Sequence, residues 1–296
     1  MNLSVGWIGA GKMGEAIIER LLDGGVAVNV WNRTPEKCAA LIDRGAQAAQ
    51  TPADAASQEV VFSIVLDDNA LRELYEREDG VLSGSASVWV DCSSVSPSAA
   101  QAAAKAAAAR GVKFVSAPVS GNPGVVRAGR LIFAVSGPEA AIEKASPFFD
   151  VIGRAVHVVG DANQATVVKI CTNALLGVLM ETLSEVAILG ETNGVKREAL
   201  LNFINDSAVG SPFSTYKTPA LVSLDFTPTF TSEAQRKDLR LALSLAEEKG
   251  ASIPLIHATE VEFDRLVESG VGSGLDIASV ISQVALDSEI DISPEN

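Results

Sequence analysis

Two groups of residues in the sequence have types and spacings that suit chemistry on a small molecule. One is a glycine-rich run near the N-terminus, between two apolar segments. The other is a pair of polar residues, Lys169 and Asn173, within a stretch that is otherwise apolar. The first group suits the binding of a phosphate and the second suits the transfer of a proton.

The glycine-rich run has the GxGxxG spacing that binds the pyrophosphate of a dinucleotide. Glycines permit a tight turn and a close approach of the backbone to the phosphates, whose charge then lies at the N-terminus of the next helix. The run follows a predicted strand and opens a predicted helix, and a second predicted strand ends at Trp31. The alternative is that the glycines serve only a tight turn. We predict a dinucleotide site at Gly9, Ala10, Gly11, Lys12, Met13 and Gly14.

The residues after the second predicted strand indicate which nicotinamide cofactor binds. NAD-dependent enzymes place a carboxylate there to hold the ribose hydroxyls. This chain has Asn32, Arg33 and Thr34 instead, so no carboxylate repels a 2′-phosphate and a guanidinium is present to pair with it. The sequence therefore predicts NADP (NADPH) rather than NAD. If Arg33 is only a surface residue, Asn32 would accept either cofactor.

Lys169 and Asn173 lie four residues apart in a predicted helix, so they share one face with Gly177. A lysine buried in an apolar helix loses solvation, which lowers the pKa of its ammonium group toward the range useful for proton transfer. The pair therefore predicts a general acid. The alternative is a lysine with a buried stem whose ammonium group reaches solvent.

Two predicted loops contain polar groups that suit a ligand. One runs from Ser116 to Asn122 at the end of the fifth predicted strand, and its hydroxyls and backbone N–H groups suit a small carboxylate. The other follows the fourth predicted strand, where Ser94 would reach the nicotinamide side of the cofactor. Ligands of open α/β sheets bind beyond the carboxyl ends of the strands, although such segments are also common as plain polar turns.

The elements that must position these residues follow from the hydrophobic pattern. Up to about residue 160, β-rich segments alternate with helical ones, which predicts a mainly parallel sheet with helices on both faces. The predicted strands are 3–9, 26–31, 59–66, 87–93, 112–119, 131–137 and 155–160, and the helices between them include 13–23, 35–44, 69–76 and 98–110. The fold class is therefore α/β, with an N-terminal NADP-binding Rossmann domain over residues 1–162.

The rest of the chain, residues 163–296, is predicted to form an all-α domain for substrate binding and oligomerisation. One long helix is expected from Ala162 to Glu191, apolar almost all round, so it must be buried or lie in a subunit interface. Further helices are predicted at 197–206, 233–249, 254–268 and 274–286, with breaks at 210–212 and 225–228. The acidic end, DSEIDISPEN, is expected to fray.

The composition excludes several classes of protein. The chain has 37 Asp+Glu against 23 Lys+Arg and a net charge of −14, so nucleic acid is not expected as a partner. The three cysteines are far apart and the two histidines lie in different predicted domains, so we expect neither a disulfide framework nor a metal site. The longest uncharged apolar stretch, Ile170 to Met180, is short for a bilayer, and no signal peptide is visible. We expect a soluble, cytoplasmic protein with no membrane partner.

Five motifs occur in a definite order over nearly the whole chain: GAGKMG, DCSSVSP, SAPVSG, GDANQATVVKICTN and RKDLRLA. In this combination the chain resembles the β-hydroxyacid dehydrogenase family, which includes 3-hydroxyisobutyrate dehydrogenases, and it is most similar to the glyoxylate/succinic semialdehyde reductase subgroup. The resemblance implies a 6-phosphogluconate dehydrogenase-like Rossmann domain, an all-α domain, and an active site between them. It also implies a homodimer or homotetramer built through the helical domains.

The resemblance further implies roles for the catalytic and substrate residues. Lys169 would protonate the carbonyl oxygen during reduction and remove the hydroxyl proton during oxidation, with Asn173 as its partner in placing the substrate. Ser120 and Gly121, followed by Asn122, would bind the substrate carboxylate. The family usually has a further glycine at the position of Asn122, so a larger polar group is expected to face the pocket here.

Other positions are implied to contact the cofactor or to close over the ligands. Ser94 would lie beside the nicotinamide ribose, and Leu66 and Asp67 would line the adenosine ribose. Lys237 would contact the cofactor and Asp238 the substrate. Two arginines on either side of this pair, Arg236 and Arg240, would contact a phosphate or a carboxylate or form a solvated helix face, and Phe213 and Phe230 are expected near the pocket.

The function that follows is hydride transfer between NADP(H) and a small β-hydroxyacid or semialdehyde, a small-molecule carboxylate, in the direction of reduction. One alternative is an imine reductase of the same fold, which usually has another residue in place of the catalytic lysine. A second is a non-catalytic NADP-binding protein, in which the catalytic pair would be lost. Lys169 and Asn173 favour the dehydrogenase over both.

Overall fold

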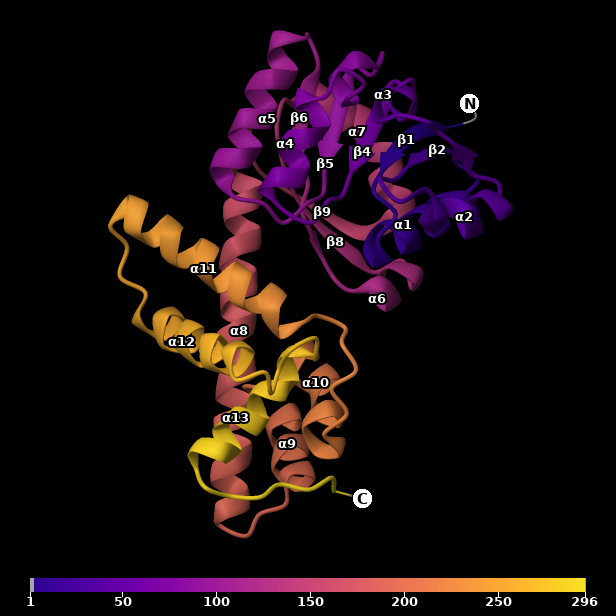
Figure 1. Cartoon of the computed structure of the whole chain (residues 1–296). Helices are drawn as coiled ribbons and strands as arrows, with labels where there is room; N and C mark the ends of the chain where they lie inside the picture. Colours follow the sequence, from indigo (N-terminus) through magenta and orange to yellow (C-terminus); the bar gives the residue numbers. More distant parts are fainter. Residues whose placement is uncertain (1–2, 296) are drawn as a thin grey trace. The chain divides into compact units, whose positions relative to one another are not determined.

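The structure is a computed structural model that describes residues 3–295 (Figure 1). The chain divides into two compact units, and the division falls inside one long helix, with Lys169 in the first unit and Ile170 in the second. We call them the Rossmann unit and the helical unit. A mainly parallel sheet with helices forms the first and helices alone form the second, which confirms the predicted fold class.

A nine-stranded sheet forms the centre of the Rossmann unit, in the order β3-β2-β1-β4-β5-β6-β8-β7, with β9 paired to β8. The strands are β1 (Ser4–Ile8), β2 (Ala27–Trp31), β3 (Gln47–Ala48), β4 (Val60–Ser63), β5 (Val88–Asp91), β6 (Lys113–Ser116), β7 (Val119–Ser120), β8 (Leu131–Ser136) and β9 (Gly153–Gly160). β8 pairs antiparallel with β6 and β7 and parallel with β9. All seven predicted strands are present, and the two that were missed, β3 and β7, have two residues each.

Helices cover both faces of this sheet (Figure 1). They are α1 (Lys12–Asp23), η1 (Pro35–Cys38), α2 (Ala39–Asp43), α3 (Pro52–Ala55), α4 (Asp68–Glu76), η2 (Val81–Ser83), α5 (Pro97–Ala109), α6 (Pro123–Arg127) and α7 (Glu139–Ile152). The helix predicted at 35–44 is a 3₁₀ turn followed by a short α-helix. The sequence reasoning missed α7, whose pattern is interrupted by Pro147.

Aromatic side chains pack on both faces because the central strands are buried on both sides. On the face covered by α1 and α7, Trp7 stacks on Phe62, with ring centroids 5.5 Å apart. On the face covered by α4 and α5, Trp89 packs edge-on against Phe114 at 5.0 Å. This packing holds the carboxyl ends of β1, β4 and β5, where the predicted cofactor loops begin.

The helical unit is built around the long helix α8. Its helices are α8 (Gln164–Thr192), α9 (Arg197–Asp206), α10 (Pro212–Ser223), α11 (Ser232–Lys249), α12 (Pro254–Glu268), η3 (Ile277–Ser279) and α13 (Val280–Asp287). The sequence reasoning missed α10, which begins at the predicted break because Ser211 caps it in a capping box. The last predicted helix begins at Ile277 rather than at 274, since Asp276 caps η3.

Within the chain, α8 is buried on one side only. Met180, Ala187 and Ile188 lie in the helical core, whereas Leu175, Leu179 and Leu189 are exposed. The whole of α8 has 29 residues and is longer than the uncharged stretch from Ile170 to Met180. By length and composition alone, α8 could cross a membrane. Helices buried in a protein core also have this length and composition. One side of α8 is buried in the core of the helical unit.

The expectation that the C-terminal end frays is wrong for the residues up to Glu295, and Asn296 lies outside the described residues. The Glu295 carboxylate accepts hydrogen bonds from the backbone N–H groups of Arg197 and Glu198, both at 2.8 Å, and so caps α9. The Arg197 guanidinium is fully buried and donates to the carbonyl groups of Leu221 and Ser293. The acidic end is therefore fastened to two helices.

Candidate functional site

The glycine loop after β1 has the shape that a bound pyrophosphate requires. Gly9 has φ +103°, and a Cβ there would lie 2.1 Å from the carbonyl oxygen of Ile64. A Cβ at Gly14 would lie 2.0 Å from the carbonyl oxygen of Gly9. At Gly11 a Cβ would meet nothing within 4 Å, so the backbone there faces open space. Two glycines are needed for packing and the third keeps the loop open to a ligand.

The N-terminus of α1 completes this cradle. Gly11 is its N-cap, and among residues 3–295 no side chain caps it. The N–H groups of the first turn and the helix dipole therefore favour an anion there. These features fit a dinucleotide pyrophosphate at the loop predicted from the sequence.

Asn32 and Arg33 have different environments at the end of β2. The Asn32 Oδ1 atom accepts a 2.9 Å hydrogen bond from the Ala10 N–H, and Nδ2 donates to the Thr34 carbonyl at 2.7 Å. Asn32 therefore fastens the glycine loop to β2. The Arg33 side chain is 75% exposed and lies 3.7 Å from the Glu73 carboxylate. Its guanidinium is accessible to a ligand.

The loop after β4 presents an apolar residue. Leu66 is 79% exposed, so its side chain is accessible to a ligand. The Asp67 carboxylate accepts from the Ala70 N–H at 2.9 Å and caps α4. Asp67 therefore stabilises the start of α4, and its contact with the adenosine ribose stays a prediction.

The loop after β5 carries Ser94 between two serines that are bonded to carboxylates. Ser93 donates to Asp91 at 2.8 Å, and Ser96 donates to Asp68 at 2.6 Å. Burial raises the pKa of Asp91 to about 6, and the hydrogen bonds from Ser63 and Ser93 oppose this rise. The sequence reasoning did not single out Asp91 or Asp68, because a carboxylate at a strand end or a helix start is common.

The predicted carboxylate loop joins β7 to α6. Ser120 and Gly121 are exposed there. Gly121 has φ +145°, and a Cβ would lie 2.8 Å from the Val125 Cγ1 atom, so this position requires glycine. Asn122 Oδ1 accepts from the Val125 N–H at 3.0 Å and caps α6. The Asn122 side chain was expected to face a pocket, and in the structure its oxygen bonds to the first turn of α6.

The structure brings together three of the predicted residues on α8 and α11. Asn173 Nδ2 donates to Asp238 Oδ2 at 2.6 Å, and Lys237 Nζ lies 3.2 Å from Asp238 Oδ1. Gln235 Nε2 also donates to the Asn173 carbonyl at 3.0 Å. Asn173 and Asp238 are 5% and 3% exposed. Lys169 lies one turn before Asn173 on α8 and is half-buried.

Helix packing explains why α8 has a glycine one turn after Asn173. A Cβ at Gly177 would lie 2.5 Å from Gln235 Nε2. A side chain at this position would displace the Gln235 amide, which donates to the Asn173 carbonyl. The spacing predicts one shared face for Lys169, Asn173 and Gly177. This face carries polar side chains and also contacts α11.

Four other candidates make contacts within the helical unit. Arg236 pairs with Asp264 at 3.1 Å, and Arg240 pairs with Glu260 at 2.8 Å, so both arginines fasten α11 to α12. The two arginines therefore have a structural role between α11 and α12. Phe213 and Phe230 are partly buried against the helical core.

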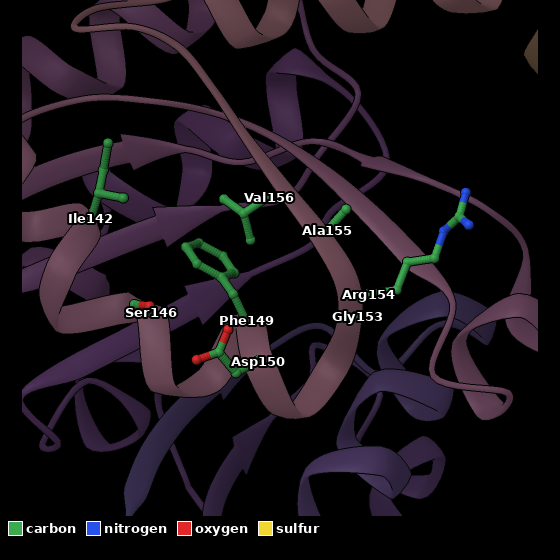
Figure 2. A pocket seen from close by; sticks show the side chains of 8 residues that line it. All are labelled: Ile142, Ser146, Phe149, Asp150, Gly153, Arg154, Ala155 and Val156. Atoms are coloured by element: carbon green, nitrogen blue, oxygen red, sulfur yellow. The ribbon is translucent and has the colours of Figure 1, made fainter.

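A hollow of about 360 Å³ lies in the Rossmann unit between α7 and β9 (Figure 2). It is lined by Ile142, Ser146, Phe149, Asp150, Gly153, Arg154, Ala155 and Val156. None of these is a predicted site residue, and Arg154 points away from Phe149 and Asp150. Across residues 3–295, no group of three or more His, Cys, Asp or Glu residues could hold a metal ion.

The cradle and the polar group on α8 define a class of protein: nicotinamide-dependent oxidoreductases with a Rossmann unit followed by a helical unit. Comparison with known families agrees. Residues 4–160 match the NAD binding domain of 6-phosphogluconate dehydrogenase, and residues 163–284 match the NAD-binding domain of NADP-dependent 3-hydroxyisobutyrate dehydrogenase.

Individual relatives point to the same family. Glyoxylate/succinic semialdehyde reductase 1 of Arabidopsis thaliana is 30% identical over 97% of this chain and 100% of its own length. The 3-hydroxyisobutyrate dehydrogenase of Pseudomonas aeruginosa is 34% identical over 85% of this chain and 88% of its own. The chain belongs to the β-hydroxyacid dehydrogenase family, and it is an NAD(P)-dependent hydroxyacid dehydrogenase.

Solved structures share the fold. The 3-hydroxyisobutyrate dehydrogenase of Mycobacterium tuberculosis superposes with a TM-score of 0.86 at 22% identity, covering 96% of this chain and 99% of that one. Psf3, solved in complex with NADP+ and 2-OPP, has a TM-score of 0.85 at 26% identity over 95% and 99% of the two chains. An imine reductase from Pseudomonas sp. has a TM-score of 0.64 at 20% identity over 95% and 99%, which shows a related fold only.

Proposed function

We propose that the protein uses NADPH to reduce a small carbonyl acid, such as a semialdehyde, and that Lys169 is the general acid. The observation that carries this proposal is the group on α8, where Lys169 lies one turn from an Asn173 side chain held by Asp238. A lysine and an amide on one helical face can donate a proton and a hydrogen bond to the same carbonyl group.

The choice of NADPH over NADH rests on the residues after β2. Arg33 is exposed and is the cation available to a 2′-phosphate, while Asn32 presents no carboxylate to repel it. The related Psf3 was solved with NADP+. Glu73 shares the guanidinium of Arg33, but both side chains are more than half exposed, so this pair is weak and a phosphate can displace it.

The chain's own residues would bind the ligands and move the proton. The bound nicotinamide supplies the hydride. Gly9, Gly11 and Gly14 would hold the pyrophosphate, and Ser120 and Gly121 would bind the substrate carboxylate. Lys169 Nζ would give its proton to the carbonyl oxygen as that oxygen gains negative charge, and it would take the proton back in the oxidation direction.

A substrate panel tests this proposal. We would follow NADPH oxidation, with NADH in parallel, against glyoxylate, succinic semialdehyde, methylmalonate semialdehyde, tartronate semialdehyde and one cyclic imine. We expect turnover of at least one of the carbonyl acids, with kcat/KM about tenfold or more in favour of NADPH. Turnover of the imine alone would indicate an imine reductase. Binding of NADPH without any turnover would indicate a non-catalytic NADP-binding protein.

We also propose that the protein is a cytoplasmic homodimer or homotetramer built through the helical unit. Exposed apolar residues of α8 occur at Val168, Leu175 and Leu189, at multiples of seven residues, with Leu179 beside them. This spacing puts the three residues on one face of α8, where the exposed Thr182 occupies the intervening heptad position, and a second helix can pack against the leucines. Light scattering after size exclusion measures the mass directly, and Leu175→Glu with Leu179→Glu should shift it to the 30.7 kDa monomer.

A further inference from the structure

Two loops of the Rossmann unit that carry predicted cofactor residues are tied to each other by carboxylates. The first follows β4 and contains Leu66. The second follows β5 and contains Ser94. The strands themselves are parallel neighbours, with Ser63 opposite Asp91, so the two loops leave the sheet side by side.

The first tie converges on Asp91, which is 1% exposed. Trp89 Nε1 donates to Ser63 Oγ at 2.8 Å, and that hydroxyl donates to Asp91 Oδ1 at 2.6 Å. On the other side, the Val65 N–H donates to Ser93 Oγ at 2.8 Å, and that hydroxyl donates to the same Oδ1 at 2.8 Å. Each serine hydroxyl accepts a hydrogen bond from an N–H group and donates a hydrogen bond to the carboxylate.

The direction of these bonds suits an ionised carboxylate. An ionised aspartate only accepts hydrogen bonds, and every group bonded to Asp91 donates, including the Ser93 N–H at 3.3 Å from Oδ2. Hydrogen bonds to a charged acceptor are the stronger kind. The network therefore offsets the cost of burying the charge and fixes Ser93 at one end of the loop that carries Ser94.

The second tie holds the other end of the same loop. Asp68, the first residue of α4, accepts from the Ser96 N–H at 2.9 Å and from the Ser96 hydroxyl at 2.6 Å. Ser96 in turn caps α5, because its Oγ accepts from the Ala99 N–H at 3.1 Å. Ser94 thus lies between two serines that are both bonded to carboxylates.

We propose that Asp91 is a positioning residue for the dinucleotide. Through Ser63 and Ser93 it holds the loops of Leu66 and Ser94 in one arrangement. The adenosine side and the nicotinamide side of the bound cofactor are then positioned by one network. The inference rests on the proposed dinucleotide function. Asp91 does not touch the cofactor in this account, and its effect is on binding rather than on the proton transfer by Lys169.

The test uses the full-length protein and three variants, Asp91→Ala, Asp91→Asn and Ser93→Ala. The Kd of NADPH is measured by fluorescence titration at a temperature where circular dichroism shows each variant to be folded. We expect Asp91→Ala to raise this Kd about tenfold or more, because two buried hydroxyls lose their acceptor. Asp91→Asn keeps one oxygen that can accept both hydroxyls, so it should recover part of the affinity.

Ser93→Ala removes one branch of the network and carries the test if Asp91→Ala does not fold. It should raise the Kd and the KM of NADPH severalfold while the KM of the carbonyl substrate stays near the wild-type value. Thr51→Ala is the matched control, since its hydroxyl caps α3 in the same unit and bonds to Asp54, not to either loop. It should lower the melting temperature without changing the Kd.

The outcomes separate this inference from the proposed function. If the wild-type protein binds neither NADPH nor NADH, the proposed function is wrong and the inference fails with it. If the wild type binds NADPH and the folded Asp91 and Ser93 variants bind it equally well, Asp91 has only a structural role and the inference alone is overturned.

Discussion

The Asn173 side chain on α8 donates a 2.6 Å hydrogen bond to the Asp238 carboxylate on α11, a residue 65 positions later in the sequence. Asp238 is 3% exposed, and its other oxygen lies 3.2 Å from Lys237 Nζ. The amide of Asn173 is therefore held by a carboxylate that is itself paired. Asp238, for which the resemblance implies a contact with the substrate, accepts the hydrogen bond of Asn173 in this structure.

Replacement of Asp238 by alanine should lower kcat by about 10- to 100-fold, because the buried Asn173 amide loses a hydrogen bond to a charged acceptor. Steady-state kinetics with NADPH and the preferred carbonyl acid measures this effect. Arg236→Ala is the control on the same helix, since Arg236 bonds to α12. A kcat for Asp238→Ala within twofold of that control would exclude the positioning of Asn173 by Asp238.

Replacement of Arg33 by alanine should raise the KM of NADPH by roughly 10- to 100-fold, because a charge-assisted contact with the 2′-phosphate is lost. The KM of NADH should stay unchanged. Arg72→Ala is a suitable control, because Arg72 is another exposed arginine that pairs with a carboxylate, Glu76. Equal effects on NADPH and NADH would show that Arg33 does not recognise the phosphate.

Glu181 should make the stability of the protein depend on pH. Burial in the helical unit, with the carboxylates of Glu185, Glu262 and Asp287, raises the pKa of Glu181 from 4.5 to about 8. The folded state therefore holds this proton more tightly than the unfolded state. The resulting stabilisation is fully present below pH 4.5 and is lost as the pH rises through 8.

Urea unfolding between pH 5 and pH 9 measures this dependence. The free energy of unfolding of the wild type should fall by about 4 kcal/mol more than that of Glu181→Gln over this range. The variant carries a neutral side chain of the same shape, so it should be the more stable protein at pH 9. Parallel pH profiles for the two proteins would mean that Glu181 is ionised in the folded state at neutral pH.

Loss of the Glu295 carboxylate should destabilise the helical unit. Glu295→Ala removes the acceptor for two N–H groups at the start of α9, and we expect a cost of about 1–2 kcal/mol in the free energy of unfolding. Glu248→Ala is the control, because Glu248 is an exposed glutamate paired only with its neighbour Lys249. An equal midpoint of denaturation for both variants would contradict the capping role.

Local patterns in the sequence predict much of this fold. The alternation of strands and helices places all seven predicted strands, and the propensity of the alanine-rich segment places α5 within one residue at each end. The errors have identifiable causes. A proline interrupts the pattern of α7, and the C-terminal tail is ordered by Glu295 and Arg197, whose contact partners are distant in the sequence.

The parts of the candidate site that a sequence motif specifies could be predicted. The parts that depend on contacts between distant residues could not. The glycine loop follows from its spacing, since Gly9 and Gly14 have no room for a Cβ and Gly11 leaves the loop open to a ligand. The network around Asp91 depends on hydrogen bonds between neighbouring strands that form only in the folded chain, whereas the Asn122 cap of α6 is local, three residues from its partner Val125. The contact between Asn173 and Asp238 joins two helices whose register no local pattern specifies.

The most direct test of the account compares Lys169→Ala with the wild type in turnover and in NADPH binding. Removal of a general acid should lower kcat by roughly 10²- to 10⁴-fold, while the Kd of NADPH stays within about twofold. That result would establish that Lys169 acts in the chemical step. A variant that keeps kcat within tenfold of the wild type while still reducing the same substrate would contradict the central claim.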